Sequence, residues 1–163
     1  MRLNLFIKKV GKVEFTGRVR SISISSKRGE KKKNVKVAIL RKNYGILKDA
    51  HAKKDSLRQV SLLMWESIKR MRRRGLEVKE GSFAENITTE GINLRKLKKG
   101  DRIFIGENVI LEVSKIGKEC LSPCSIYKRV GYCIMPKEGI FAKVLKGGKI
   151  KVGDKITFSH LVK

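Results

Sequence analysis

The sequence predicts a mainly β protein, a closed β-barrel of short, mostly antiparallel strands with a few helices. Three observations support this fold class. Residues 17–26 alternate with a period of two and are rich in β-branched side chains. A Gly-Asp turn followed by an alternating apolar strand occurs twice, at residues 99–106 and 152–159. Helical spacing of apolar residues is clear only within residues 58–74.

After the first strand, the chain is expected to form a loop, a second strand and a surface segment. Residues 27–33 are basic and contain Gly29, which predicts a loop. Residues 34–40 (NVKVAIL) are β-branched and apolar, which predicts a strand. Residues 41–55 are polar and contain a glycine, so we expect an extended segment on the surface.

The segment 58–74 is open to two interpretations. Ser56 and Gln59 match a capping box, which would start a helix there. Alternatively, its first residues (RQVSLL) form a short strand and the helix begins near Met64. Periodicity does not decide between these two arrangements. In both, Gly75 follows the helix, and the arginines occupy the last turn, where the helix dipole favours positive charge.

The remaining segments predict strands. Residues 108–114 are expected to form a hairpin with the strand that precedes them. Residues 140–145 are expected to pair, through a turn at Gly147 and Gly148, with the last strands of the chain. No Pro-rich linker and no low-complexity segment divides the sequence, so we expect a single domain over residues 1–163.

The net charge is strongly positive, because 40 Lys and Arg residues face 15 Asp and Glu residues, which gives +25. Residues 27–33 and 69–74 form the two densest basic clusters. This charge predicts attraction to polyanions such as nucleic acid. Aromatic residues do not interleave with the basic clusters, and no zinc-finger or RNP-like signature occurs, so we expect the attraction to be non-specific. A polyanion-binding module is one alternative function.

Membrane association is not expected from this sequence. No run approaches the roughly 20 apolar residues of a membrane-spanning helix. The apolar part of the N-terminal segment is short and is interrupted by Lys8 and Lys9, unlike a signal peptide. We therefore expect a cytoplasmic protein whose three cysteines are reduced thiols.

The cysteines are the first candidates for chemistry. Cys120, Cys124 and Cys133 lie within fourteen residues, and their spacing lacks the C-x2-C pairs of structural zinc sites. Lysine and arginine residues surround them in the sequence, which favours a reactive thiolate. The other interpretation is that they are small buried apolar residues. The signatures of nucleotide-binding loops, zinc hydrolases and serine hydrolases are not present.

Several short segments occur in the order in which one known family carries them. They are residues 21–27 (SISISSK), 49–52 (DAHA), 58–63 (RQVSLL), 81–88 (GSFAENIT), 111–114 (LEVS), 117–120 (GKEC) and 131–136 (GYCIMP). Together with the Gly-Asp turns they extend over residues 17–158. On these segments the chain resembles a stand-alone bacterial MOSC domain, the domain named for the C-terminal part of eukaryotic molybdenum-cofactor sulfurases.

The resemblance implies a β-barrel with a few helices, like the barrel inserted in pyruvate kinases, and it favours a strand at RQVSLL. It also implies binding of the molybdenum cofactor (molybdopterin), or handling of the sulfur that becomes its terminal ligand. Family members use one cysteine for this, either as a persulfide carrier or as a direct molybdenum ligand. By position Cys120 matches that cysteine, and Cys124, which follows Pro123, is the second candidate.

A pterin phosphate would be held by cationic and hydrogen-bonding side chains. The candidates that the resemblance implies are Lys27, His51, Arg58 and Asn86. Arg58 is the strongest, because a guanidinium can grip a phosphate with two parallel hydrogen bonds. The chain departs from other members at Lys48, where glycine is frequent, and at Leu57, where histidine is frequent.

The resemblance also implies partner proteins. The desulfurase domain of full sulfurases is not in this sequence, so a cysteine desulfurase-type protein is the expected sulfur donor and a molybdoenzyme is the expected acceptor. The alternative from the same resemblance is an enzyme that reduces N-hydroxylated compounds with the molybdenum cofactor. It would take electrons from a partner, because no flavin or iron–sulfur motif occurs here.

Overall fold

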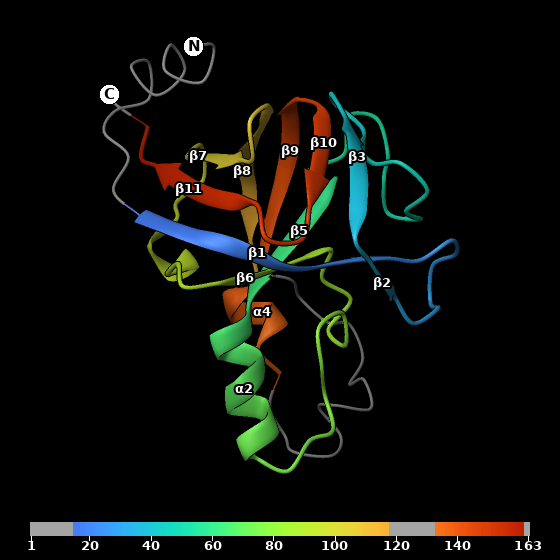
Figure 1. Ribbon diagram of the computed structural model, residues 1–163, viewed down its shortest axis with the longest axis vertical. Coiled ribbons are helices and arrows are strands. Elements are labelled where there is room, and N and C mark those ends of the chain that lie inside the picture. The colour runs from blue at the N-terminus through green and yellow to red at the C-terminus, as the bar shows by residue number, and fades with distance from the viewer. Residues whose placement is uncertain (1–14, 118–132, 162–163) are drawn as a thin grey trace.

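The computed structural model describes residues 15–117 and 133–161 (Figure 1). Its helical elements are α2 (Trp65–Arg73), α4 (Met135–Glu138) and the 3-10 turn η1 (Leu94–Lys96). Its strands are β1 (Phe15–Ile24), β2 (Lys33–Val35), β3 (Val37–Arg41), β4 (Gly45–Ile46), β5 (Val60–Met64), β6 (Ile87–Glu90), β7 (Arg102–Ile105), β8 (Val109–Ile116), β9 (Ile140–Lys146), β10 (Gly148–Lys151) and β11 (Lys155–Ser159). No helix in these ranges has the length and apolar character needed to span a membrane.

Seven of the described strands close into a barrel. Their order is β11-β7-β8-β9-β5-β6-β1, and β1 pairs with β11 to complete the ring. The pairing of β5 with β6 is parallel, and the other pairings in the ring are antiparallel. A smaller sheet, β10-β3-β4, lies beside the barrel, whereas α2 and α4 lie together at its lower end in Figure 1. The predicted fold class is confirmed.

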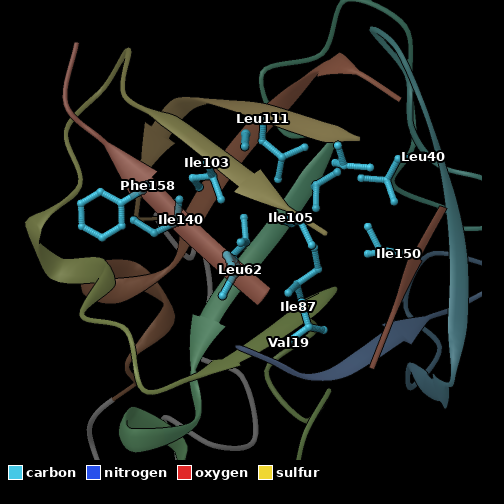
Figure 2. Packing of buried hydrophobic residues seen from close by; sticks show 14 of the residues in the cluster. Val19, Leu40, Leu62, Ile87, Ile103, Ile105, Leu111, Ile140, Ile150 and Phe158 are labelled. Carbon is cyan, nitrogen blue, oxygen red and sulfur yellow. The ribbon is translucent and has the colours of Figure 1, made fainter. Parts of the chain in front are cut away.

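The core has two parts, because strand alternation sends side chains to both faces of the barrel wall. The first part fills the barrel with residues such as Val19, Leu62 and Phe158, and Leu40 and Ile150 of the smaller sheet join it (Figure 2). The second part lies outside the wall, around the two helices. It comprises Leu63, Trp65, Ile68, Met71, Leu76, Val78, Phe83, Ile134, Met135 and Phe141.

The structure decides between the two interpretations of residues 58–74. Val60–Met64 is a strand and the helix begins at Trp65. The Ser56 hydroxyl accepts the N–H of Arg58 at 3.0 Å, which makes a short turn and not a helix cap. All five residues of β5 are buried, since one face lines the barrel and the other lies under α2. Because both faces are buried, this strand has a continuous apolar run, and its periodicity does not distinguish it from a helix.

Three predictions about individual strands and segments are wrong in detail. The strand expected at residues 34–40 is divided at Lys36, because β2 pairs with β1 whereas β3 joins the smaller sheet. The surface segment expected at residues 41–55 contains β4, whose two residues are buried. Residues 140–145 were expected to pair with the last strands of the chain, but they belong to β9, which pairs with β8 and β5. The chain then turns at Gly147 and places β10 against β3. A Cβ at Gly147 would lie 2.4 Å from the Leu40 carbonyl oxygen, so the turn fits closely against β3.

Candidate functional site

Three strands begin or end at the same end of the barrel, here called the site end. The antiparallel pair Ile22–Ile87 places the last residues of β1 beside the first residue of β6. The parallel pair Leu62–Ile87 brings the beginning of β5 to the same end. The antiparallel pairs Leu62–Ile140 and Ile116–Ile140 place the beginning of β9 and the end of β8 beside the middle of β5, on the side that faces α2. The loops at the site end therefore come from distant parts of the sequence.

The residues predicted to form the site flank these strands. Lys27 follows β1, Arg58 precedes β5 and Asn86 precedes β6. Cys120 and Cys124 belong to the segment between β8 and β9 and lie outside the described residues, so their roles stay predictions. The barrel topology thus brings the loops that carry Lys27, Arg58 and Asn86 to one end, although the sequence separates them widely.

Arg58 is exposed beside β9, the strand that follows the cysteine segment. Its guanidinium carbon lies 5.5 Å from the centre of the Phe141 ring in β9, a cation–π contact. Phe141 lies opposite Lys115 in β8, two residues before the strand gives way to Gly117. No ion pair joins Arg58 to a carboxylate within residues 15–117 and 133–161. Among these residues, its guanidinium is available to an external anion.

Both flanks of the cysteine segment are fixed to the barrel. The N–H of Gly117 donates to the carbonyl of Gly139 at 2.7 Å, which links the end of β8 to the beginning of β9. Gly117 has a φ of +76°, and a Cβ there would lie 2.0 Å from the carbonyl oxygen of Pro136. Cys133 is half-buried and packs against the apolar cluster outside the barrel. The segment that carries Cys120 therefore starts and finishes at defined places.

Glu138 fastens α4, the helix that follows Cys133. Its carboxylate accepts hydrogen bonds from the Ser67 hydroxyl at 2.8 Å, from Arg70 at 2.6 Å and from Arg95 at 3.0 Å. Burial opposes ionisation of Glu138, but these hydrogen bonds prevail and lower its pKa. Since Ser67 and Arg70 belong to α2 and Arg95 to η1, the carboxylate joins three elements.

His51 belongs to a buried charged cluster that the sequence did not reveal. The Lys32 ammonium lies 2.7 Å from Asp49 Oδ1, and their side chains are 1% and 0% exposed. Asp49 also accepts the N–H groups of Ser25 at 3.1 Å and of His51 at 3.2 Å. This cluster ties the loop after β1 to the segment that carries His51. Lys32 stands between two other lysines, and nothing in the sequence distinguishes it from them.

The contact between Lys32 and His51 sets the tautomer of the imidazole. The Lys32 ammonium lies 3.2 Å from His51 Nδ1. Because an ammonium only donates hydrogen bonds, Nδ1 must be the acceptor and the ring proton resides on Nε2. The His51 side chain is 38% exposed. The ring therefore offers a hydrogen-bond donor, Nε2–H.

Asn86 is buried in the barrel wall, and the structure uses its amide to join strands. The side-chain oxygen accepts the N–H of Ser61 in β5 at 3.0 Å. The side-chain nitrogen donates to the carbonyl of Ser23 in β1 at 3.1 Å. Asn86 is 1% exposed. These contacts support a positioning role at the site end, and its predicted contact with the cofactor stays a prediction.

Glu85, next to Asn86, is a second buried group that sequence reasoning did not select. Its carboxylate accepts the N–H groups of Gly81 at 2.9 Å and Phe83 at 3.1 Å, and the Thr88 hydroxyl at 2.7 Å. Burial raises the pKa of Glu85, and these hydrogen bonds only partly offset that effect. The Glu85 carboxylate therefore holds the loop before β6 in its conformation.

The described part of the site end is thus a set of donors and cations. Lys27 and Arg58 are exposed and His51 is partly exposed, whereas the carboxylates of Asp49 and Glu85 accept hydrogen bonds from the protein's own donors. Within the described ranges, no group of three or more His, Cys, Asp or Glu side chains could hold a metal ion. Such an arrangement suits an anion, and it would favour the thiolate form of a nearby cysteine.

Comparisons with known proteins agree with this architecture. The model of the MOSC domain family matches residues 48–157. The YuaD protein from Bacillus subtilis has a similar structure, with a TM-score of 0.74 and 17% identity over 91% of this chain and 99% of that one. YiiM from Geobacillus stearothermophilus has a TM-score of 0.63 and 19% identity, over 90% of this chain and 75% of that one. A search among curated proteins found no match.

Proposed function

The chain belongs to the MOSC domain family, and on that premise we propose that it binds the molybdenum cofactor and handles the sulfur that becomes the cofactor's terminal ligand. Cys120 is the proposed sulfur-handling residue. One observation carries the proposal: the strand ends bring Lys27 and Arg58 to one end of the barrel, and Arg58 contacts Phe141, the second residue of the strand that follows the cysteine segment.

The residues at the site end fit a phosphorylated cofactor. Arg58 would bind the pterin phosphate through its guanidinium, which no described carboxylate neutralises. Lys27 is exposed in the neighbouring loop, and His51 lies beside that loop through the contact of its Nδ1 with Lys32. Asn86 and Asp49 would keep these loops in place through their buried hydrogen bonds. When bound, the cofactor would supply a soft molybdenum centre, for which a cysteine thiolate is a suitable ligand.

In the proposed sulfur step, the Cys120 thiolate attacks the terminal sulfur of a persulfide on a donor protein. The donor's sulfur–sulfur bond breaks, its thiolate leaves, and a new sulfur–sulfur bond forms on Cys120. The transferred sulfur keeps its oxidation level, so the exchange needs no external oxidant or reductant. The proposed donor is a cysteine desulfurase-type protein, the proposed acceptor is a molybdoenzyme, and the proposed compartment is the cytoplasm, where thiols remain reduced.

The first test is an anaerobic titration of molybdenum cofactor, freshly released from a molybdoenzyme, into the full chain. We expect saturable binding that weakens about tenfold in Arg58→Gln, because one charge-assisted contact is lost. Cys120→Ala should also weaken binding. Arg41→Gln is the matched control, since Arg41 is an exposed arginine of the smaller sheet. Absence of saturable binding to the unmodified chain would contradict the proposal.

Intact mass measurement tests the sulfur step. After exposure to a cysteine desulfurase and cysteine, the unmodified chain should gain one sulfur atom, and Cys120→Ala should gain none. Cys124→Ala should still gain it. If the Cys124 variant fails and the Cys120 variant succeeds, the sulfur-handling role belongs to Cys124 instead.

A further inference from the structure

A cleft of about 480 Å³ lies at the other end of β5 and β6, away from the site end. It lies between α2 and the segment that joins β6 to η1. Clefts of this size commonly hold small molecules. Met64 and Ile92 contribute apolar surface, and the charged lining comes from Glu66 and three arginines, Arg70, Arg73 and Arg95.

The arginines leave positive charge in this cleft. Arg70 and Arg95 share a single carboxylate, Glu138. Arg73 is exposed in the last turn of α2 and pairs with no carboxylate in the described part of the chain. Guanidinium groups bind phosphate strongly, because two of their N–H donors can meet two phosphate oxygens. The cleft therefore presents a phosphate-binding side.

Glu66 gives the cleft a second side, which favours a cation. Its Oε2 accepts the N–H of Gly91 at 3.2 Å. Its Oε1 is buried and has no hydrogen-bond donor among the described residues. A buried carboxylate oxygen without a donor is costly, so a cation beside the Glu66 carboxylate would be favourable. The cleft thus has cations at one place and, at another, the Glu66 carboxylate, one oxygen of which lacks a donor among the described residues.

We propose that this cleft binds a small organic phosphate that also carries an amino group, with Arg73 on the phosphate and Glu66 on the amine. The lining residues lie at the end of β5 and β6 opposite Lys27, Arg58 and Asn86, so the cleft is separate from the proposed contacts with the cofactor phosphate. A bound ligand of this kind would place an ammonium beside the Glu66 carboxylate and a phosphate beside the Arg73 guanidinium at once.

Two probes separate the two contacts. Phosphoethanolamine and ethyl phosphate share the phosphate group, but only phosphoethanolamine has an ammonium. In calorimetric titrations of the full chain, we expect phosphoethanolamine to bind roughly tenfold tighter than ethyl phosphate. Arg73→Gln should weaken both probes about tenfold, since it removes the phosphate contact. Glu66→Gln should abolish the difference between the probes.

Arg41→Gln is again the matched control and should leave both affinities unchanged. Equal affinities of the unmodified chain for the two probes would overturn the proposal. So would an equal loss in Arg41→Gln and Arg73→Gln, because it would show only generic attraction to the +25 charge. An NMR titration of the unmodified chain avoids any effect of the substitutions on folding. Phosphoethanolamine should shift the Gly91 and Asn93 amide signals, and unmoved signals would also overturn the proposal.

Discussion

The two ends of β1 are held by charged groups in very different surroundings. Just after its last residue, Ser25 donates to Asp49, whose carboxylate pairs with Lys32, and both side chains of this pair are out of contact with water. Toward its beginning, Arg18 and Arg20 bind Glu90 on the surface, and the Arg18 side chain is 61% exposed. Water screens the second arrangement and not the first. The burial of a pair, more than its geometry, should therefore decide what its loss costs.

The largest effect should come from breaking the buried pair. Lys32→Met keeps the length of the side chain but leaves the Asp49 carboxylate buried without its cation. We expect a loss of about 3–5 kcal/mol in the free energy of unfolding, measured by urea denaturation. Arg18→Met, the same kind of change at the exposed end, should cost about 1 kcal/mol or less. Similar losses in the two variants would show that burial does not control the contribution of these pairs.

A backbone constraint just after β8 should give the next largest effect. In Gly117→Ala the new Cβ would meet the Pro136 carbonyl oxygen at 2.0 Å, in addition to the unfavourable positive φ. We expect a loss of roughly 3 kcal/mol in unfolding free energy. Gly153→Ala has a similar positive φ but no atom within 4 Å of the new Cβ, so it should cost only about 1 kcal/mol. Equal losses would mean that the contact with Pro136 relaxes freely.

Acid should separate the Glu138 carboxylate, which is 9% exposed, from that of Glu90, which is 24% exposed. The folded state lowers the pKa of Glu138 below 4.5, so its stabilisation is complete above that pH and disappears as the pH falls through the lowered pKa. At pH 7, Glu138→Gln should reduce the unfolding free energy by about 2 kcal/mol, and the difference should vanish in acid. Glu90→Gln should show the same trend with a smaller amplitude, since Glu90 is in contact with water. A pH-independent difference for Glu138→Gln would contradict the assignment.

The smallest expected effect has the opposite sign. Lys48 has a φ of +72°, a conformation that glycine adopts more easily than lysine, and it directly precedes buried Asp49. Lys48→Gly should raise the unfolding free energy by about 0.5–1 kcal/mol, as measured by chemical denaturation. Lys53→Gly is the control, because Lys53 has no positive φ and should gain nothing. A loss of stability in Lys48→Gly would show that the lysine side chain contributes more than the strain.

The fold class could be predicted well from the sequence, because most barrel strands turn one face toward the core and the other outward. The hairpin of β7 and β8 illustrates this, since alternation and a short turn are local properties. β5 could not be assigned by periodicity, because both of its faces are buried. The partner of β10 could not be predicted either, since β3 lies more than a hundred residues earlier and no local signal records that pairing.

The candidate site was predicted in part, and for a similar reason. Arg58 and His51 were selected through resemblance to a family. The structure places their loops at the end of the barrel where β1 ends and β6 begins. Lys32 was missed because its role depends on burial, which a run of lysines does not reveal. Asn86 was selected as a ligand, whereas its visible contacts join strands, since a sequence pattern does not distinguish a binding amide from a structural one.

The hydrogen bond between Gly117 and Gly139 has a consequence for how this domain can diversify. β8 and β9 are neighbours in the barrel, so the two ends of the segment between them are held together whatever its length. Doubling the length of a flexible loop with fixed ends costs only about 0.6 kcal/mol in closure entropy. Insertions and exchanges of sequence between these anchors should therefore be tolerated. A domain built in this way can acquire new cysteine segments, and with them new partners, without redesign of the barrel.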